Sequence, residues 1–322
     1  MELNEVEAEI SRRLSISPKD AETIVKKAIS SREIDENCTA DRWLKERFIP
    51  NCVEIDNEGY ARMCIDALKI LSTTAKTDYG ASRQRDLSQL WADMTRGYLG
   101  EMAFIMFLKR NWRIDAKLGH EIGQLDDYLP MDIHSVKREG ESEYRLPGIK
   151  IGVKAVKWNA IWLDIPGAQF LHSDVHVLVK TGTGQDSLFA FLKSISVFRD
   201  KVLKEGTRIE AITQKEAEEM FERLPSFRPI AAYICGFVPK SATFDRLPYE
   251  GRMGRKHFTI TSWNGPINPG DLEEIKRREP IPTEGKVGFE GIGQFAHDKG
   301  YLFSAGKLIW QRDSWKQVLD KL

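Results

Sequence analysis

The order of helical and strand-like patterns restricts the fold of this chain more than any other sequence feature. Segment 85–111 carries apolar residues at helical spacing along its whole length. Short segments that alternate, or that are rich in β-branched residues, follow from residue 131. They read MDIHSV, IKIGVKAVK, AIWLDI, DVHVLVK, SLFAFLK and IAAYICGFV. One long helix followed by several strands predicts an α/β (α+β) domain in which helices flank a mixed central β-sheet.

Helical patterns also occupy the chain before this domain. Apolar residues recur at helical spacing from Leu3 to Leu14, and Ser17-Pro18 has the pattern of a helix start. Gly, Pro and Arg are frequent in the last part of the chain. We therefore divide the chain into a helical N-terminal region at 1–80, a core at 81–240, and an irregular basic region with C-terminal capping elements at 241–322.

Formal charges balance, since 48 Lys and Arg residues face 48 Asp and Glu residues. Nucleic-acid-binding proteins often carry a basic excess, but a local basic surface is enough for binding. The four cysteines include no C-x-x-C pair, which argues against a structural zinc site or a disulfide. No apolar run approaches the roughly 20 residues of a membrane span. The acidic N-terminal segment lacks the apolar stretch of a signal peptide, so we expect a soluble, cytoplasmic protein without a membrane partner.

Glu101 shares a helical stripe with apolar residues of the long helix. A carboxylate on such a stripe is costly to bury unless it is paired or binds a metal ion. Gly97 and Gly100 flank it, and both are expected to let another backbone approach closely. The alternative is that Glu101 lies at the edge of the stripe and pairs with an arginine such as Arg85 or Arg96.

Two further charged residues lie on the strand-like segments. Asp132 lies near the start of the segment MDIHSV, where an aspartate is often only a turn residue. Lys154 lies within IKIGVKAVK, and strand alternation places it on the face opposite Val153. Lysine is seldom buried in a central strand without a partner. The alternative is an edge strand whose lysines are solvated, which explains Lys150 and Lys157 better than Lys154.

Taken in order, a helix with an inward glutamate precedes a strand aspartate, and a hairpin then leads to a strand that carries x-Val-Lys. This order resembles the PD-(D/E)xK nuclease superfamily, which includes most type II restriction endonucleases. The matching residues are Glu101, Asp132 and Lys154, with Val153 at the variable position, and the resemblance covers roughly residues 85 to 195. It implies a restriction-endonuclease-like fold and a site-specific deoxyribonuclease activity on double-stranded DNA.

One position departs from the motif. Its second acid should fall at position 152, where this chain has Gly152. Another carboxylate can replace it, and Glu101 is the first candidate, ahead of Asp164 and Asp174 on later strands. The departure also leaves open a catalytically dead relative that only binds DNA or serves protein assembly.

The resemblance implies Mg²⁺ as the cofactor, because a hard cation with oxygen ligands neutralises the scissile phosphate and activates water. Asp132, Glu101 and the backbone carbonyl of Val153 would hold the ion. Lys154 would orient the attacking water or stabilise the charge of the transition state.

DNA must also be held in place. Lys150 and Lys157 are candidates for contacts with neighbouring phosphates. Arg252, Arg255 and Lys256 lie in a locally basic, glycine-containing segment that we interpret as a DNA-binding loop. The alternative for each of these residues is an ordinary solvated loop.

The implied partners follow from the chemistry of a restriction enzyme. Symmetric cutting of both strands calls for a homodimer, and the helical N-terminal region is a candidate for DNA recognition or dimerisation. A companion DNA methyltransferase is expected in the same system. A DNA repair or junction-resolving nuclease of the same fold would share the site and differ only in its substrate.

Overall fold

The structure is a computed structural model that describes residues 1–77, 86–119, 132–184, 186–242, 247–252, 255–259, 269–271, 282–283, 289–290 and 299–322. The helices and strands, in chain order, are α1 (Leu3–Leu14), α2 (Pro18–Ser30), α3 (Ala40–Arg42), η1 (Trp43–Phe48), η2 (Ile49–Asn51), β1 (Cys52–Ile55), α4 (Asn57–Thr77), α5 (Leu87–Trp112), β2 (Ile114–Leu118), β3 (Ile133–Arg138), β4 (Ile151–Lys157), β5 (Trp162–Pro166), α6 (Gly167–His172), β6 (Val175–Thr181), α7 (Ser187–Ser194), η4 (Phe198–Leu203), α8 (Lys204–Arg208), α9 (Gln214–Arg223), β7 (Ile230–Pro239), β8 (Leu247–Arg252), β9 (Arg255–Thr259), η5 (Pro269–Asp271), β10 (Pro282–Thr283), β11 (Lys299–Ser304), η6 (Ala305–Lys307) and α11 (Arg312–Leu319).

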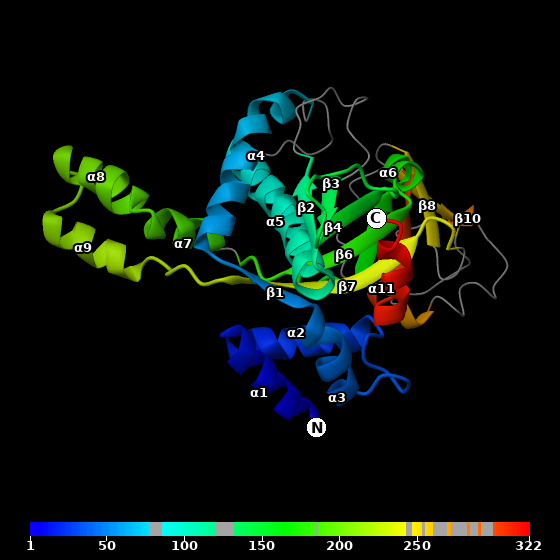
Figure 1. Cartoon of the computed structure of the whole chain (residues 1–322). Coiled ribbons are helices and arrows are strands. Elements are labelled where there is room, and N and C mark those ends of the chain that lie inside the picture. Colours follow the sequence, from blue (N-terminus) through cyan, green and yellow to red (C-terminus); the bar gives the residue numbers. More distant parts are fainter. Residues whose placement is uncertain are drawn as a thin grey trace.

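A mixed four-stranded sheet forms the centre of the molecule, in the order β1-β7-β6-β4 (Figure 1). Strands β4 and β6 are parallel, whereas β7 is antiparallel to both β6 and β1. All seven residues of β6 are buried, which agrees with a strand covered on both faces. The expected α/β class, with helices flanking a mixed central sheet, is confirmed.

A two-stranded sheet of β2 and β3 lies beside the free edge of β4. The contact is made just before β3 begins, where the Asp132 amide donates to the Ile151 carbonyl at 3.2 Å. This hydrogen bond brings the start of β3 to the strand that carries Lys154.

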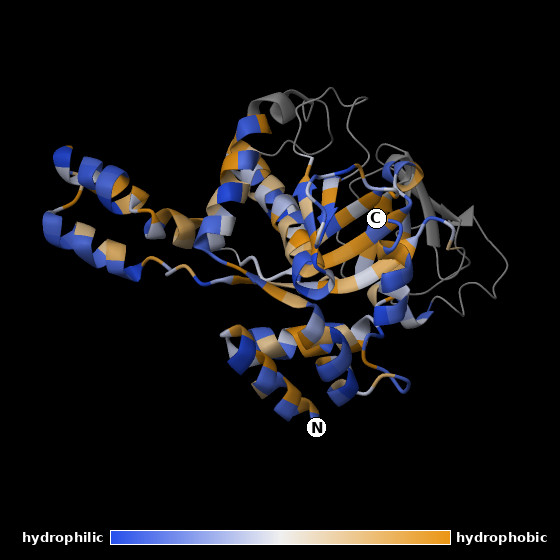
Figure 2. Ribbon diagram, in the orientation of Figure 1, coloured by the Kyte–Doolittle hydropathy of each residue, from blue (hydrophilic) through white to orange (hydrophobic). Residues whose placement is uncertain are grey.

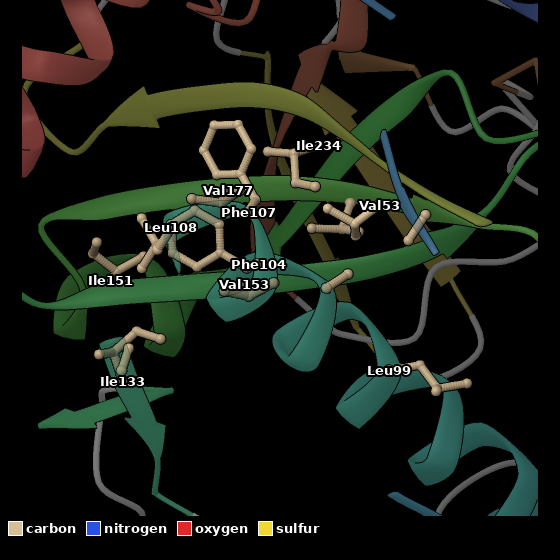
Figure 3. Packing of buried hydrophobic residues seen from close by; sticks show 14 of the residues in the cluster. Val53, Leu99, Phe104, Phe107, Leu108, Ile133, Ile151, Val153, Val177 and Ile234 are labelled. Atoms are coloured by element: carbon tan, nitrogen blue, oxygen red, sulfur yellow. The ribbon is translucent and has the colours of Figure 1, made fainter. Parts of the chain in front are cut away.

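The long helix α5 covers one face of the central sheet. The Asp86 side chain caps its first turn by accepting from the Gln89 amide, and Arg113 ends it with a φ of 56°. Figure 3 shows side chains of α5 turned toward those of the sheet. The residues of α5 that are buried in this core are Leu99, Ala103, Phe104, Phe107 and Leu108.

The N-terminal helices pack on the opposite face of the sheet. Ser17 caps α2, as its sequence predicts, by accepting from the Asp20 amide at 3.1 Å. The apolar faces of α1, α2 and η1 share a second core with β5, β7 and β11. Besides these helices, the chain before α5 supplies β1, which joins the central sheet, and the helix α4.

The connection between β6 and β7 is a helical arm made of α7, η4, α8 and α9, and it extends away from the sheet (Figure 1). Figure 2 shows that α8 and α9 are mainly hydrophilic, whereas the sheet strands are mainly apolar. The segment SLFAFLK was expected to be a strand, and this prediction was wrong, because residues Ser187–Ser194 form α7. A short apolar run does not distinguish a strand from a helix with one buried face. In α7 the buried residues include Ala190 and Phe191.

The structure also describes the cysteines and the apolar character of the helices. All four cysteines are free, and three of them are buried. Within the part of the chain that the structure describes, no helix has both the length and the apolar character that crossing a bilayer requires.

A buried ion pair ties the N-terminal helices to the central sheet. Lys180 of β6 donates to Glu33 at 2.5 Å, and the two side chains are only 4% and 0% exposed. The Tyr233 hydroxyl and the Ser31 hydroxyl also donate to Glu33, at 2.9 Å and 2.7 Å. Burial would raise the pKa of Glu33, but the charges of Lys180 and Arg47 outweigh it and lower that pKa.

We predict that Lys180→Met lowers the free energy of unfolding by about 3–5 kcal/mol, because it leaves the Glu33 carboxylate buried without its cation. Chemical denaturation at pH 7 measures the change. Lys26→Met is the matched control, since Lys26 pairs with Glu22 on an exposed face and should change stability by less than about 1 kcal/mol. Equal effects of the two substitutions would contradict the prediction.

Candidate functional site

The candidate site begins where β3 meets β4. The Asp132 carboxylate accepts a hydrogen bond from the Val153 amide at 2.5 Å. The amide and the carbonyl of one strand residue point to the same side of the strand, so the Val153 carbonyl is directed to this edge as well. The structure therefore brings together two of the residues that were expected to bind a metal ion.

Lys154 lies next along β4, on the opposite face from Val153. Its Nζ donates to the Gln169 side chain of α6. Burial lowers the pKa of the Lys154 ammonium group, while the charges of Asp132, Asp164 and Glu101 act in the opposite direction. Three carboxylates, one just before β3, one in β5 and one in α5, thus lie close enough to Lys154 to act on its charge.

Glu101 reaches this neighbourhood because α5 touches β4 one residue earlier. A Cβ atom on Gly100 would lie 2.4 Å from the Cβ of Ala155, so only glycine permits this approach. The same expectation for Gly97 was wrong, because nothing lies within 4 Å of a Cβ placed there. Glu101 is partly buried, and the stripe that faces the sheet is that of Leu99 and Ala103.

Of the two arginines considered as alternative partners of Glu101, the structure describes Arg96. Arg96 binds Asp93 at 3.0 Å and the Thr183 hydroxyl at 3.2 Å. Arg85 lies outside the described residues.

A side chain at position 152, where the motif expects an acid, would require the Ser173 side chain to shift. A Cβ atom on Gly152 would lie 2.8 Å from the Ser173 hydroxyl and 3.4 Å from His176 Nδ1. Of the two weaker substitutes, Asp174 accepts from the Lys150 amide at 2.9 Å and thus fixes the start of β4. Asp164 instead acts on the charge of Lys154.

His176 is a buried residue beside this site that the sequence patterns did not single out. It lies opposite Gly152 in the β4–β6 pairing and stacks on Phe170, with ring centroids 5.3 Å apart. Burial, with the charge of Lys154, lowers the pKa of His176 to about 4. Gln169 and Ser173 were missed as well, because each is a lone polar residue without a recognisable spacing.

The expected DNA-binding residues fall in two places. Lys150 and Lys157 are exposed and lie just before and at the end of β4. Arg252 pairs with Arg255, and Gly251 with Lys256, in the β8–β9 hairpin. The expected loop is therefore largely a hairpin, which joins β11 and β5 in a five-stranded sheet.

The donors at this edge suit Mg²⁺ in kind, since they are carboxylate and carbonyl oxygens. Among the described residues, no group of three or more His, Cys, Asp or Glu side chains converges as a metal cluster. Mg²⁺ does not need such a cluster, because it commonly binds one or two carboxylates and keeps several waters. The fit therefore depends on Asp132, the Val153 carbonyl and one further acid.

Comparison with family models, with curated proteins and with solved structures finds no match for this chain. Its function is therefore inferred from the geometry of the site.

We predict that Lys154→Met raises the pKa of His176, because the charge of Lys154 is one of the causes that hold that pKa near 4. Histidine-selective NMR titration measures the shift. Lys150→Met serves as the control and should leave the titration of His176 unchanged. An unchanged His176 pKa in Lys154→Met would mean that the ammonium group lies elsewhere.

Proposed function

We propose that this protein is a Mg²⁺-dependent endonuclease of the PD-(D/E)xK type that cleaves double-stranded DNA at a specific short sequence, as type II restriction enzymes do. The observation that carries the proposal is the meeting of Asp132, Val153 and Lys154 at one sheet edge. The charge of Glu101 acts at the same place, from the preceding helix.

The arrangement of elements supports this reading. Helix α5 precedes the strand that follows Asp132, β3 leads to β4, and a crossover that contains α6 returns to the parallel strand β6. The hairpin expected between the aspartate strand and the lysine strand is not formed, because β3 pairs with β2 and not with β4. The order of helix, aspartate strand and lysine strand still follows the resemblance, so we propose a restriction-endonuclease-like fold for the core.

A divalent cation at this edge would polarise the scissile phosphate and lower the pKa of an attacking water. Asp132, Glu101 and the Val153 carbonyl are the residues that would hold it. The hydrogen bond from the Val153 amide holds the Asp132 carboxylate in one orientation. A carboxylate that is already oriented does not need to move when charge develops on the phosphate in the transition state.

Lys154 would stabilise the negative charge that develops on the phosphate. Its ammonium group is positioned by Gln169 and kept beside carboxylates, which favour its charged form. A cation held there stabilises the extra negative charge of the transition state. Carboxylates without a facing lysine would indicate only a metal site.

Residues near the two ends of β4, the strand that carries Lys154, would contact DNA. Lys150 and Lys157 are exposed near the two ends of β4, so each can reach a phosphate beside the cut. Arg252, Arg255 and Lys256 of the β8–β9 hairpin remain candidates for base or phosphate contacts. A homodimer and a companion methyltransferase complete the proposal.

We predict that Asp132→Ala and Lys154→Ala each reduce DNA cleavage by at least about 10²–10³-fold, since each removes a charge that stabilises the transition state. Glu101→Ala should also reduce it. Conversion of supercoiled plasmid with Mg²⁺, and with EDTA as the metal-free comparison, measures activity. Lys316→Ala is the control, because Lys316 is exposed and pairs with Asp320 at the end of the C-terminal helix.

Wild-type protein that cuts neither plasmid nor branched DNA in the presence of Mg²⁺ contradicts the nuclease assignment. Cleavage restricted to branched junctions would indicate a junction-resolving enzyme on the same fold. Discrete fragments from linear duplex support the restriction enzyme, and mapping of their ends gives the recognition sequence.

We predict that Lys150→Ala and Lys157→Ala each weaken DNA binding similarly for all sequences. Each should also lower the slope of log K against log salt by about one, because one phosphate contact is lost. Fluorescence anisotropy with Ca²⁺ in place of Mg²⁺ measures binding without cleavage. A loss confined to one sequence would mean that the lysine reads a base.

A further inference from the structure

We propose that the outer part of the helical arm is a docking surface for a second copy of this chain, in which two arms pack together with opposite charges facing each other. The inference gives a contact surface to the homodimer of the proposed function, but the geometry and charge of the arm carry it, without reference to DNA cleavage. The docking part consists of η4 with α8, which we call the basic limb, and of α9, which we call the acidic limb.

The arm is not needed to connect the strands on either side of it. Strands β6 and β7 are antiparallel neighbours in the central sheet, and such strands can be joined by a loop of about two to five residues. Here the connection runs from Thr181 to Ile230 and extends away from the sheet (Figure 1). None of the described residues of the two hydrophobic cores comes from the two limbs. The limbs therefore point to a role outside the fold itself.

The two limbs bury little of their own surface. Leu203 of the basic limb and Ala217 of the acidic limb are their buried residues. Val202 is 54% exposed, Met220 is 47% exposed, and Ile209, directly after α8, is 56% exposed. Helices as short as these gain most of their stability from packing against other elements, so a partner that covers them would stabilise them.

Contacts between the limbs leave a groove between them. Lys193 of α7 donates to the Leu224 carbonyl at 2.7 Å, and the Arg199 guanidinium lies 4.1 Å from the centroid of the Phe221 ring. The groove has a volume of about 900 Å³, and residues of both limbs line it.

The walls of this groove carry opposite charges. Lys201 and Lys204 line it from the basic limb, whereas Glu218 and Glu222 line it from the acidic limb, and all four are exposed. The ion pairs that the structure describes within the limbs join residues of the same helix, three or four positions apart. The charges of one wall are therefore not paired with those of the other within one arm.

A twofold arrangement of two arms would place the basic wall of each copy against the acidic wall of the other. In such an interface each patch contacts a different patch of the partner, and the reverse contact forms as well. A surface that binds itself in this way must carry both charges, as the groove does. The product would be a bundle of helices from two hairpins, which is a stable way to cover short helices.

DNA is a poorer match for the groove than a second copy. The basic limb has four basic and two acidic residues, and the acidic limb has two basic and four acidic residues. The limbs together are neutral, and DNA in the groove would meet the acidic wall. Charge complementarity therefore favours the arm of another copy.

Sedimentation equilibrium of the full-length protein, without DNA, tests the proposal. We expect the wild type to dimerise and higher salt to weaken the dimer, because salt screens exposed charges. Lys201→Glu with Lys204→Glu reverses the basic wall, and Glu218→Lys with Glu222→Lys reverses the acidic wall. Each double variant should weaken self-association at least about tenfold, because like charges then face each other in both halves of the interface.

Mixing the two double variants in equal amounts separates a lost interface from a damaged arm. The mixture should form a heterodimer about as tightly as the wild type dimerises, because both contacts again join opposite charges. Lys19→Glu with Lys26→Glu is the matched control, since it reverses two exposed lysines of α2, and it should dimerise like the wild type. Thermal unfolding checks that each variant is folded, and the single variants Lys204→Glu and Glu222→Lys replace a pair that is not.

A wild type that stays monomeric overturns the proposal, and so does a mixture that fails to associate. Loss of the dimer in the α2 variant would put the interface on the N-terminal helices and also overturn it. A monomeric wild type whose DNA binding is weakened by the basic-wall reversal and strengthened by the acidic-wall reversal would mean that the groove binds DNA instead.

The same measurements keep this inference apart from the nuclease assignment. If the arms associate as expected but the protein cuts no DNA, the interface stands and the nuclease assignment fails. If the protein cuts DNA and its association does not respond to either reversal, the nuclease assignment stands and this inference fails.

Discussion

The close contact of α5 with β4 is the constraint on which the candidate site depends. Gly100 brings the helix so near to Ala155 that any side chain would separate them. Helix α5 is held in this position by its aromatic residues, because Phe104 and Phe107 pack on Trp315, with ring centroids 5.9 Å and 5.4 Å apart. The C-terminal helix α11 thus fixes the helix that presents Glu101, although the two are far apart in the sequence.

The opposite face of the sheet is organised by charge as well as by apolar packing. Glu33 follows the N-terminal helices, and it meets Lys180 and Tyr233 from the two central strands. Arg47 donates to the carbonyls of Cys235 and Ala305, which joins the region after β11 to the same network. Polar groups that are satisfied only in one arrangement favour a unique packing of the N-terminal helices on the sheet.

The spacing of apolar residues predicted most helices and strands, but it did not predict which side chains of different elements contact one another. The alternation in IKIGVKAVK correctly separated Val153 from Lys154, because a strand has only two faces. The stripe of α5 was misplaced, because the helix buries a broad face and several stripes fit its apolar residues. The roles of Gln169 and His176 depend on contacts between β4, α6 and β6, which no spacing within one segment reveals.

The balance of charge at the site has a consequence for how DNA would be bound. Three carboxylates act on one lysine, so the formal charge of these four side chains is negative. Such a site repels a phosphodiester and attracts a divalent cation. Under the proposed function, Asp132, Glu101 and the Val153 carbonyl would therefore hold the metal ion before the phosphate approaches, and the ion would offset their negative charge. This order removes the need for a basic excess, and it agrees with a chain whose 48 basic and 48 acidic residues balance.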